Sequence, residues 1–255
     1  MKAVRILAFN TYREILRDKI LYGFLIFAIF FIGLSLALGQ LSYAEQIRIT
    51  ANFGTTALQL SSIFLAILLG AVLLPREIEK KTILTILVRP LARWQFLLGK
   101  VLGLFLMIAV VGGGLSGIVA LVMFMAGGKD LHYLLPILYG TLLESLIMLS
   151  VTLLFSTFSR PILVGCMSFG IFLIGHWQST LNELSKNESQ QSLRTFKKVI
   201  EFIIPDLEVF NWKGLLIYQD PISYSTLGVA TLYAIGWFFV LMFIASLIFE
   251  RKDLG

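Results

Sequence analysis

Charged residues are scarce in this sequence, and hydrophobic residues are abundant. Asp, Glu, Lys and Arg make up 14% of the 255 residues, whereas 58% are hydrophobic and the mean hydropathy is +0.88. A surface that faces water on all sides needs more polar side chains than this composition supplies. The sequence therefore predicts that a lipid bilayer surrounds most of the folded chain.

Residue types that carry enzyme chemistry are also few. The chain has a single cysteine, Cys166, which excludes an internal disulfide, and its two histidines, His132 and His176, have no metal-ligand spacing with other candidate ligands. A phosphate-binding loop is missing, since Gly99 and Lys100 lack the upstream glycine, and no serine lies in a G-x-S-x-G turn. The sequence predicts no catalytic, metal or cofactor site and no ATP hydrolysis by this chain alone.

Long apolar runs fill most of the chain. A helix needs about 20 mostly apolar residues to cross the hydrocarbon core of a bilayer, and six runs are long enough. We therefore predict an all-α integral membrane protein that forms a single transmembrane domain over residues 1–255. The expected spans lie at about 20–39, 57–74, 101–126, 133–158, 162–181 and 227–249.

Glycines gather in the third of these runs. Gly112, Gly113, Gly114 and Gly117 include a pair of small residues four positions apart. Such spacing lets the backbones of two membrane helices approach closely. We therefore expect this face to pack against another helix of the bundle.

Two segments outside the spans have their own patterns. Residues 1–19 mix five cations with apolar side chains, which is typical of a helix that lies in the membrane interface. Residues 182–226 are predicted to form an outer loop. Within this loop, apolar residues at helical spacing from Leu193 to Ile204 indicate a surface helix. This helix could simply pack on the membrane or receive an extracytoplasmic partner.

The distribution of cations predicts which side of the membrane each end faces. If the chain crosses six times, 14 of its 21 Lys and Arg residues share a side with the N-terminus. Cytoplasmic loops carry the excess of Lys and Arg. Both termini of this multi-pass cell-membrane protein are therefore expected in the cytoplasm. Because the cations sit at the ends of apolar runs, the formal charge of +6 does not indicate nucleic-acid binding.

The most informative polar stretch follows the second span. Residues 77–89 are predicted to form an amphipathic helix, because four polar residues recur at every fourth position opposite a broad apolar face. These four are Glu77, Lys81, Thr85 and Arg89. Pro90 ends the helix at Arg89, since the residue before a proline avoids helical geometry. The pattern alone leaves two interpretations open, a plain interfacial helix and a helix that docks on a partner.

This stretch resembles the permease subunits of ABC transporters of the type-2 exporter class, in which the second span is followed by R-E-x-E-x-x-T-x-x-x-L-x-x-R-P-x-x-R-x-x-x-x-x-G-K. The matching residues here are Arg76, Glu77, Glu79, Thr82, Ile86, Leu87, Arg89, Pro90, Arg93, Gly99 and Lys100. The ending Phe249–Leu254 resembles the F-x-R-R-D-L ending common in that class, with Lys252 in place of the second arginine. The stretch Pro205–Asn211 is most similar to the subfamily that includes permeases accompanying nitrous-oxide-reductase maturation.

The resemblance implies a permease that forms the translocation path of an ATP-driven exporter. In this class two permeases, identical or related, bind two separate cytoplasmic ATPase subunits, which hold the ATP and Mg²⁺. The helix at 77–89 would then be a cytoplasmic coupling helix seated in a groove of the ATPase. The residues expected to make this contact are Glu77, Glu79, Lys80, Thr82, Arg89, Pro90 and Arg93.

Two other functions remain open from the sequence. An ion-coupled secondary transporter or channel would carry charges within several spans or paired broken helices, and only Glu144 fits that description. A membrane anchor that recruits an ATPase complex without transport would carry the same helix at 77–89.

Glu144 lies in the fourth apolar run, where a carboxylate costs about 2.5 to 3.5 kcal/mol on insertion scales. Its side chain is therefore expected to face the bundle, a partner or water. Two roles are open: contact with a substrate or ion along the transport path, or hydrogen bonding that holds helices together, with His176 or a serine as partner. His176 and Trp177 themselves are expected to act as anchors at the outer interface.

Overall fold

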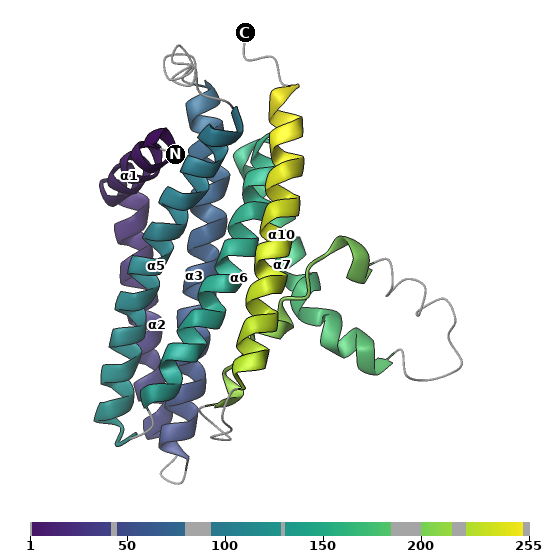
Figure 1. Ribbon diagram of the computed structural model, residues 1–255. Coiled ribbons are helices and arrows are strands. Elements are labelled where there is room, and N and C mark those ends of the chain that lie inside the picture. The colour runs from purple at the N-terminus through teal and green to yellow at the C-terminus, as the bar shows by residue number, and fades with distance from the viewer. Residues whose placement is uncertain are drawn as a thin grey trace.

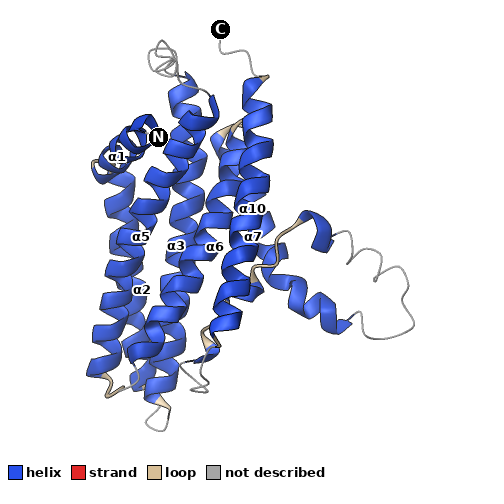
Figure 2. Ribbon diagram, in the orientation of Figure 1, coloured by secondary structure: helices blue, strands red, loops and turns tan. Residues whose placement is uncertain are grey.

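The described part of the protein is helical. The computed structural model describes residues 2–41, 45–79, 93–128, 131–184, 200–215 and 223–251. Within these ranges there is no strand, as Figure 2 shows. The main helices are α1 (Lys2–Leu16), α2 (Lys19–Gln40), α3 (Gln46–Glu79), α5 (Arg93–Met125), α6 (Leu134–Ser156), α7 (Pro161–Leu184) and α10 (Tyr224–Glu250), with the short 3₁₀ helices η1 (Leu131–Tyr133) and η2 (Glu208–Phe210).

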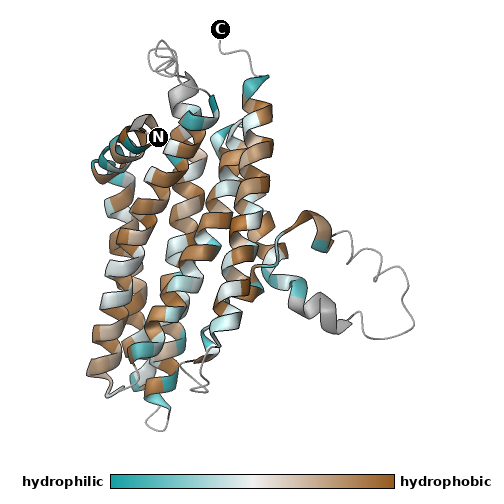
Figure 3. Cartoon of the chain, in the orientation of Figure 1, coloured by the Kyte–Doolittle hydropathy of each residue, from teal (hydrophilic) through white to brown (hydrophobic). Residues whose placement is uncertain are grey.

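Among the described residues, six helices are long and apolar enough to cross a membrane. They are α2, α3, α5, α6, α7 and α10. Hydrophobic residues run along the length of the bundle, and hydrophilic residues gather toward its ends (Figure 3). The prediction of a multi-pass helical membrane protein is confirmed.

The spanning helices form a bundle around α6, which contacts α3, α5, α7 and α10. Both chain termini lie at one end of this bundle, and at the same end α3 finishes and α5 begins (Figure 1). We call this the terminal end and the opposite one the far end. The last turns of α7 point away from the bundle (Figure 1).

Helix α3 begins well before the expected start at residue 57. Its first turns carry polar residues, which the apolar run did not include, yet Thr50 and Thr55 are buried. The hydroxyl of Thr55 donates to the carbonyl of Ala51 over 2.8 Å. Because such hydroxyls find partners on the main chain, the polar residues extend a buried helix and do not form a loop.

Helix α3 also continues past its expected end at residue 74. Pro75 lies inside the helix, which runs on to Glu79. A proline removes one main-chain hydrogen bond, and packing against neighbouring membrane helices tolerates this loss. The helix therefore continues beyond the apolar run, whereas the part of α3 that is long and apolar enough to span a membrane ends at Leu73, close to the expected residue 74. Of the predicted helix at 77–89, the first three residues belong to α3, and residues 80–92 lie outside the described ranges.

Helix α1 packs across α5 near the terminal end. A methyl group added at Gly103 would lie 2.5 Å from the carbonyl oxygen of Ala8 and 2.7 Å from Cβ of Thr11. At Gly99 it would lie 2.8 Å from Cβ of Leu7. These two glycines, four residues apart, therefore allow the close contact between the two helices.

The glycines expected to make such a contact do not make it. A methyl group at Gly113, Gly114 or Gly117 would meet no atom within 4 Å, and at Gly112 it would meet only ordinary contacts. The prediction chose the right helix and the right kind of motif, but the close contact lies at Gly99 and Gly103, several turns nearer to the start of α5. The sequence pattern cannot show which face of α5 another helix covers.

We predict that Gly103→Ala destabilises the protein by about 1 to 3 kcal/mol, because α1 must move away from α5 to make room. Gly113→Ala is the matched control on the same helix. It should be neutral or stabilising by up to about 1 kcal/mol, since alanine favours helices and the space is open. Unfolding of the purified variants in detergent measures both. Equal stability of the two variants would contradict this packing.

Candidate functional site

A buried polar cluster lies between α3, α6 and α7. Its centre is Glu144 of α6, whose side chain is 0% exposed. Nearby hydroxyls of α6 bond to their own helix: Thr141 donates to the carbonyl of Ile137, and Ser145 donates to the carbonyl of Thr141. These hydroxyls are therefore satisfied locally, and the partners of Glu144 come from other helices.

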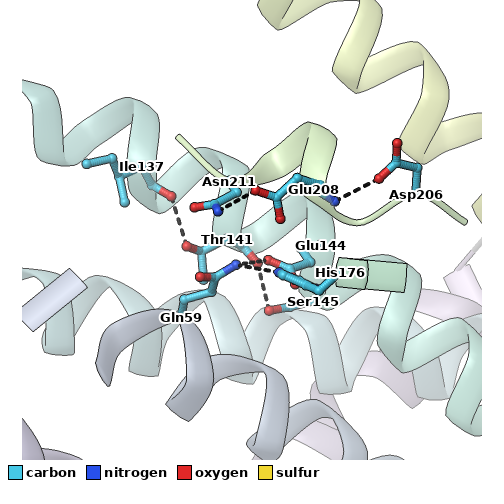
Figure 4. Close-up of polar contacts among 9 residues, drawn as sticks. All are labelled: Gln59, Ile137, Thr141, Glu144, Ser145, His176, Asp206, Glu208 and Asn211. Carbon is cyan, nitrogen blue, oxygen red and sulfur yellow. Dashed lines mark hydrogen bonds and ion pairs between the residues drawn. The ribbon is translucent and has the colours of Figure 1, made fainter. Parts of the chain in front are cut away.

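Two neighbouring helices supply those partners (Figure 4). Gln59 of α3 donates through Nε2 to Oε2 of Glu144 over 2.6 Å. Nε2 of His176 on α7 lies 3.4 Å from Oε1 of Glu144, a close polar contact without hydrogen-bond geometry. Nε2 of His176 also lies 3.4 Å from Nε2 of Gln59. The cluster thus joins three spanning helices through one carboxylate.

His176 was one of the two partners proposed for Glu144 from the sequence, and the structure brings the two together. Its expected role as an interfacial anchor is not supported, because its Nε2 lies beside the buried Glu144 and its Nδ1 is also buried. Trp177, the next residue, is 58% exposed on the outside of α7. Consecutive residues of a helix point in directions about 100° apart, which explains how neighbours can have different surroundings.

The segment after α7 lies against the same region. The N–H of Leu207 donates to the carbonyl of Gly175 over 3.3 Å, and Nε2 of Gln178 donates to the carbonyl of Ile204 over 3.0 Å. The N–H of Asp206 donates to the hydroxyl of Tyr233 on α10 over 2.7 Å. Residues 204–213, which we call the outer segment, are therefore held against α7 and α10.

Glycines allow this close contact on two helices. A methyl group at Gly175 of α7 would lie 2.8 Å from Cγ of Leu207, and one at Gly140 of α6 would lie 2.7 Å from the carbonyl oxygen of Phe210. Leu207 and Phe210 are both buried. The outer segment therefore packs as part of the bundle.

Charged groups of the outer segment bond to one another and act on the cluster. Glu208 donates through its N–H to Oδ1 of Asp206, and Asn211 donates through Nδ2 to Oε1 of Glu208 (Figure 4). Burial raises the pKa of the Asp206 carboxyl, and the N–H of Glu208 opposes this rise. Burial lowers the pKa of the Lys213 amine, against the pull of Glu144 and Glu208. Glu144 and Glu208 therefore favour the charged form of Lys213, which burial disfavours.

A second set of polar contacts fixes the terminal end. Nη1 of Arg93 donates to the carbonyls of Phe249 over 2.8 Å and Glu250 over 2.9 Å. Both carbonyls belong to the last turn of α10, where main-chain carbonyls lack the usual partner further along the helix. The Phe249 carbonyl also accepts from the N–H of Arg251. Nζ of Lys100, a residue only 4% exposed, lies 3.6 Å from Oε2 of Glu14 in α1. The first turns of α5 therefore connect to both α1 and α10.

The residues expected to contact an ATPase are placed only in part. Glu77 and Glu79 lie in the last turn of α3, and Arg93 begins α5. Lys80, Thr82, Arg89 and Pro90 lie outside the described residues. Arg93 has a role inside the chain that the sequence did not indicate, the cap on α10.

Gln59 was missed as a member of the buried cluster, and Lys213 was missed as a nearby charge that acts on it. Gln59 could have been noticed, since an amide within the second apolar run needs a partner as a carboxylate does. Lys213 gave no such signal, because a lysine in a polar loop is ordinary. Among the described residues, no group of three or more His, Cys, Asp or Glu side chains could hold a metal ion.

The fold and these contacts define a multi-pass helical membrane protein whose termini lie together at one end. The sequence model of the family described as ABC-2 family transporter protein matches residues 6–254. The chain therefore belongs to the ABC-2 transporter family, and it is a membrane permease subunit of an ABC transporter. Comparison with curated proteins gave no match. The family supports the resemblance seen in the sequence, without resolving the subfamily.

We predict that Glu144→Ala destabilises the protein by about 3 kcal/mol, since it leaves a cavity and removes the acceptor of Gln59. Glu144→Gln should cost about 1 kcal/mol or less, because an amide oxygen can still accept that hydrogen bond. Denaturant unfolding in detergent micelles compares the two. If both variants lose the same stability, the contact with Gln59 does not hold the helices together.

Proposed function

We propose that this permease forms the translocation path of an ATP-driven exporter and couples to separate cytoplasmic ATPase subunits through residues 77–93. Family membership supports a partnership with ABC ATPases. The arrangement of the chain agrees with a contact at one place, because α3 ends and α5 begins beside both termini (Figure 1). ATP and Mg²⁺ would be held by the partner subunits.

The observation that carries the proposal is the continuity of α3 through Pro75. One helix runs from the buried cluster to the terminal end, so Gln59 and Glu79 belong to the same rod. At 1.5 Å per residue they are about 30 Å apart along its axis. A push on residues 77–93 would then tilt α3 and displace Gln59 relative to Glu144, a rigid-body change of the lever type.

The contacts of α5 extend the same motion to other helices. Arg93 is bonded to the end of α10, and Lys100 is paired with Glu14 of α1. A displacement of the start of α5 would therefore carry α1 and α10 with it. Under this proposal the ATPases move α1, α5 and α10 as one unit, while α3 transmits the movement toward the outer segment.

The further features of the proposal come from the type-2 exporter class. The transporter would contain a second permease, identical or related, and transport would run outward with both termini in the cytoplasm. The stretch Pro205–Asn211 supports the subfamily that includes permeases accompanying nitrous-oxide-reductase maturation. In this arrangement residues 182–226 face outward, where they could meet an extracytoplasmic partner.

An ion-coupled transporter or channel is less well supported. Within the described spans, the buried charged side chains are Glu144 and Lys100. Lys100 is paired with Glu14 near the terminal end, whereas Glu144 belongs to the cluster with Gln59 and His176. Two separate groups with partners of their own do not form a series of sites along a path.

We predict that Glu77→Lys or Glu79→Lys abolishes the stimulation of the partner ATPase, because charge reversal at an interface replaces attraction by repulsion. Glu45→Lys, a charge reversal at the far end, is the control and should leave stimulation unchanged. The measurement is ATP hydrolysis by the reconstituted complex with and without the permease. Unchanged stimulation in both variants would refute the assignment of these carboxylates.

ATP-dependent flux in proteoliposomes separates an exporter from a membrane anchor that only recruits an ATPase. An exporter shows flux that the Glu77→Lys variant lacks. An anchor shows ATPase binding and no flux in any variant.

A further inference from the structure

The outward face of α1 combines arginines with apolar side chains. Ile6 and Phe9 are exposed, with Phe9 at 48%. Arg5 and Arg13 are exposed along the same helix, and Arg17 is exposed directly after its end. The guanidinium of Arg13 lies 4.4 Å from the ring centre of Phe9. The opposite face is occupied, since Thr11 and Ile15 are buried. The outward face therefore offers hydrophobic surface and positive charge together.

A groove runs beside this face, between α1 and α5. Its volume is about 670 Å³, and it is lined by Arg5, Ile6, Ala8, Phe9, Asn10 and Leu106. Leu106 belongs to the spanning helix α5, about one turn beyond the contact of Gly103 with α1. The groove thus leads from the polar side of α1 onto a membrane-spanning surface.

The charge of the groove is positive. The single acidic residue of α1, Glu14, lies 3.6 Å from the buried amine of Lys100 and so has a cation of its own. The arginine at the groove, Arg5, is exposed, and Asn10 adds an amide that can donate a hydrogen bond. Arginine binds phosphate groups well because its planar head offers several donors.

We propose that this groove binds an anionic phospholipid of the leaflet next to α1, with the headgroup phosphate at Arg5 and Asn10 and an acyl chain along Phe9 and Leu106. The position of Leu106 on a spanning helix favours a lipid over a soluble protein as the occupant of the groove. A soluble protein could reach the arginines of α1, but it could not follow the groove onto the apolar surface of a spanning helix. Anionic lipids are attracted to basic segments of this kind beside a membrane.

Native mass spectrometry of the full-length permease in detergent tests the proposal. Dioleoylphosphatidylglycerol and dioleoylphosphatidylcholine have the same acyl chains and differ in headgroup charge. The wild type should bind the anionic lipid preferentially. Arg5→Gln should weaken that binding about fivefold, as expected for one cation near the membrane surface. It should weaken phosphatidylcholine binding less, because the choline cation already neutralises the phosphate of that lipid. Arg5→Lys, which keeps the charge, should retain the preference.

Arg160→Gln is the matched control, because Arg160 is exposed and lies outside the groove. It belongs to the connection between α6 and α7, which is at the same end of the bundle as α1 (Figure 1). It should bind both lipids as the wild type does. Equal affinity of the wild type for the two lipids would overturn the proposal, and so would an unchanged preference in Arg5→Gln.

A second variant tests the groove apart from the charge. Ala8→Leu adds volume to the groove lining and keeps every arginine, so the preference for the anionic lipid should fall. If the preference stays, the arginines attract lipid as a diffuse charged surface, and the groove is not a binding site.

Discussion

The contact of α5 with α1 is the interaction on which the terminal end depends. It requires a bare backbone at Gly99 and Gly103, and it buries Lys100 against Glu14. Arg93, at the start of the same helix, holds the end of α10. These contacts all belong to the first turns of α5. A single stretch of sequence therefore fixes the position of the start of α5 relative to α1 and α10. The groove beside α1 follows from the same packing.

The buried cluster around Glu144 constrains how α3, α6 and α7 pack inside the bundle. A carboxylate in a membrane span is costly unless other groups satisfy it, and Glu144 obtains its partners from α3 and α7. The outer segment packs against this region, and Glu144 and Lys213 influence each other electrostatically. Helix α3 connects the buried cluster with the terminal end, since it carries Gln59 in the cluster and Glu79 at the terminal end. The proposed coupling depends on this shared helix.

The six spans could be predicted because each is a long apolar run, and the bilayer leaves a helix as the way to satisfy the backbone. The start of α3 could not be predicted from the sequence, because Thr50 becomes buried only when other helices pack around it. The glycine motif was assigned to Gly113 and Gly117, whereas Gly99 and Gly103 make the close contact. Glu144 could be selected because a carboxylate in a membrane span is energetically costly. Lys213 could not, because it comes near Glu144 only when the outer segment packs on the bundle, and no local sequence pattern predicts that packing.

The proposed coupling requires that residues 80–92 join α3 and α5 on the cytoplasmic side, where an ATPase can act on them. Labelling with a membrane-impermeant maleimide tests this directly, in intact cells and with Cys166→Ser as background. Thr85→Cys should react only after the membrane is permeabilised, whereas Glu45→Cys, at the far end, should react from outside. Labelling of Thr85→Cys in intact cells would contradict the account.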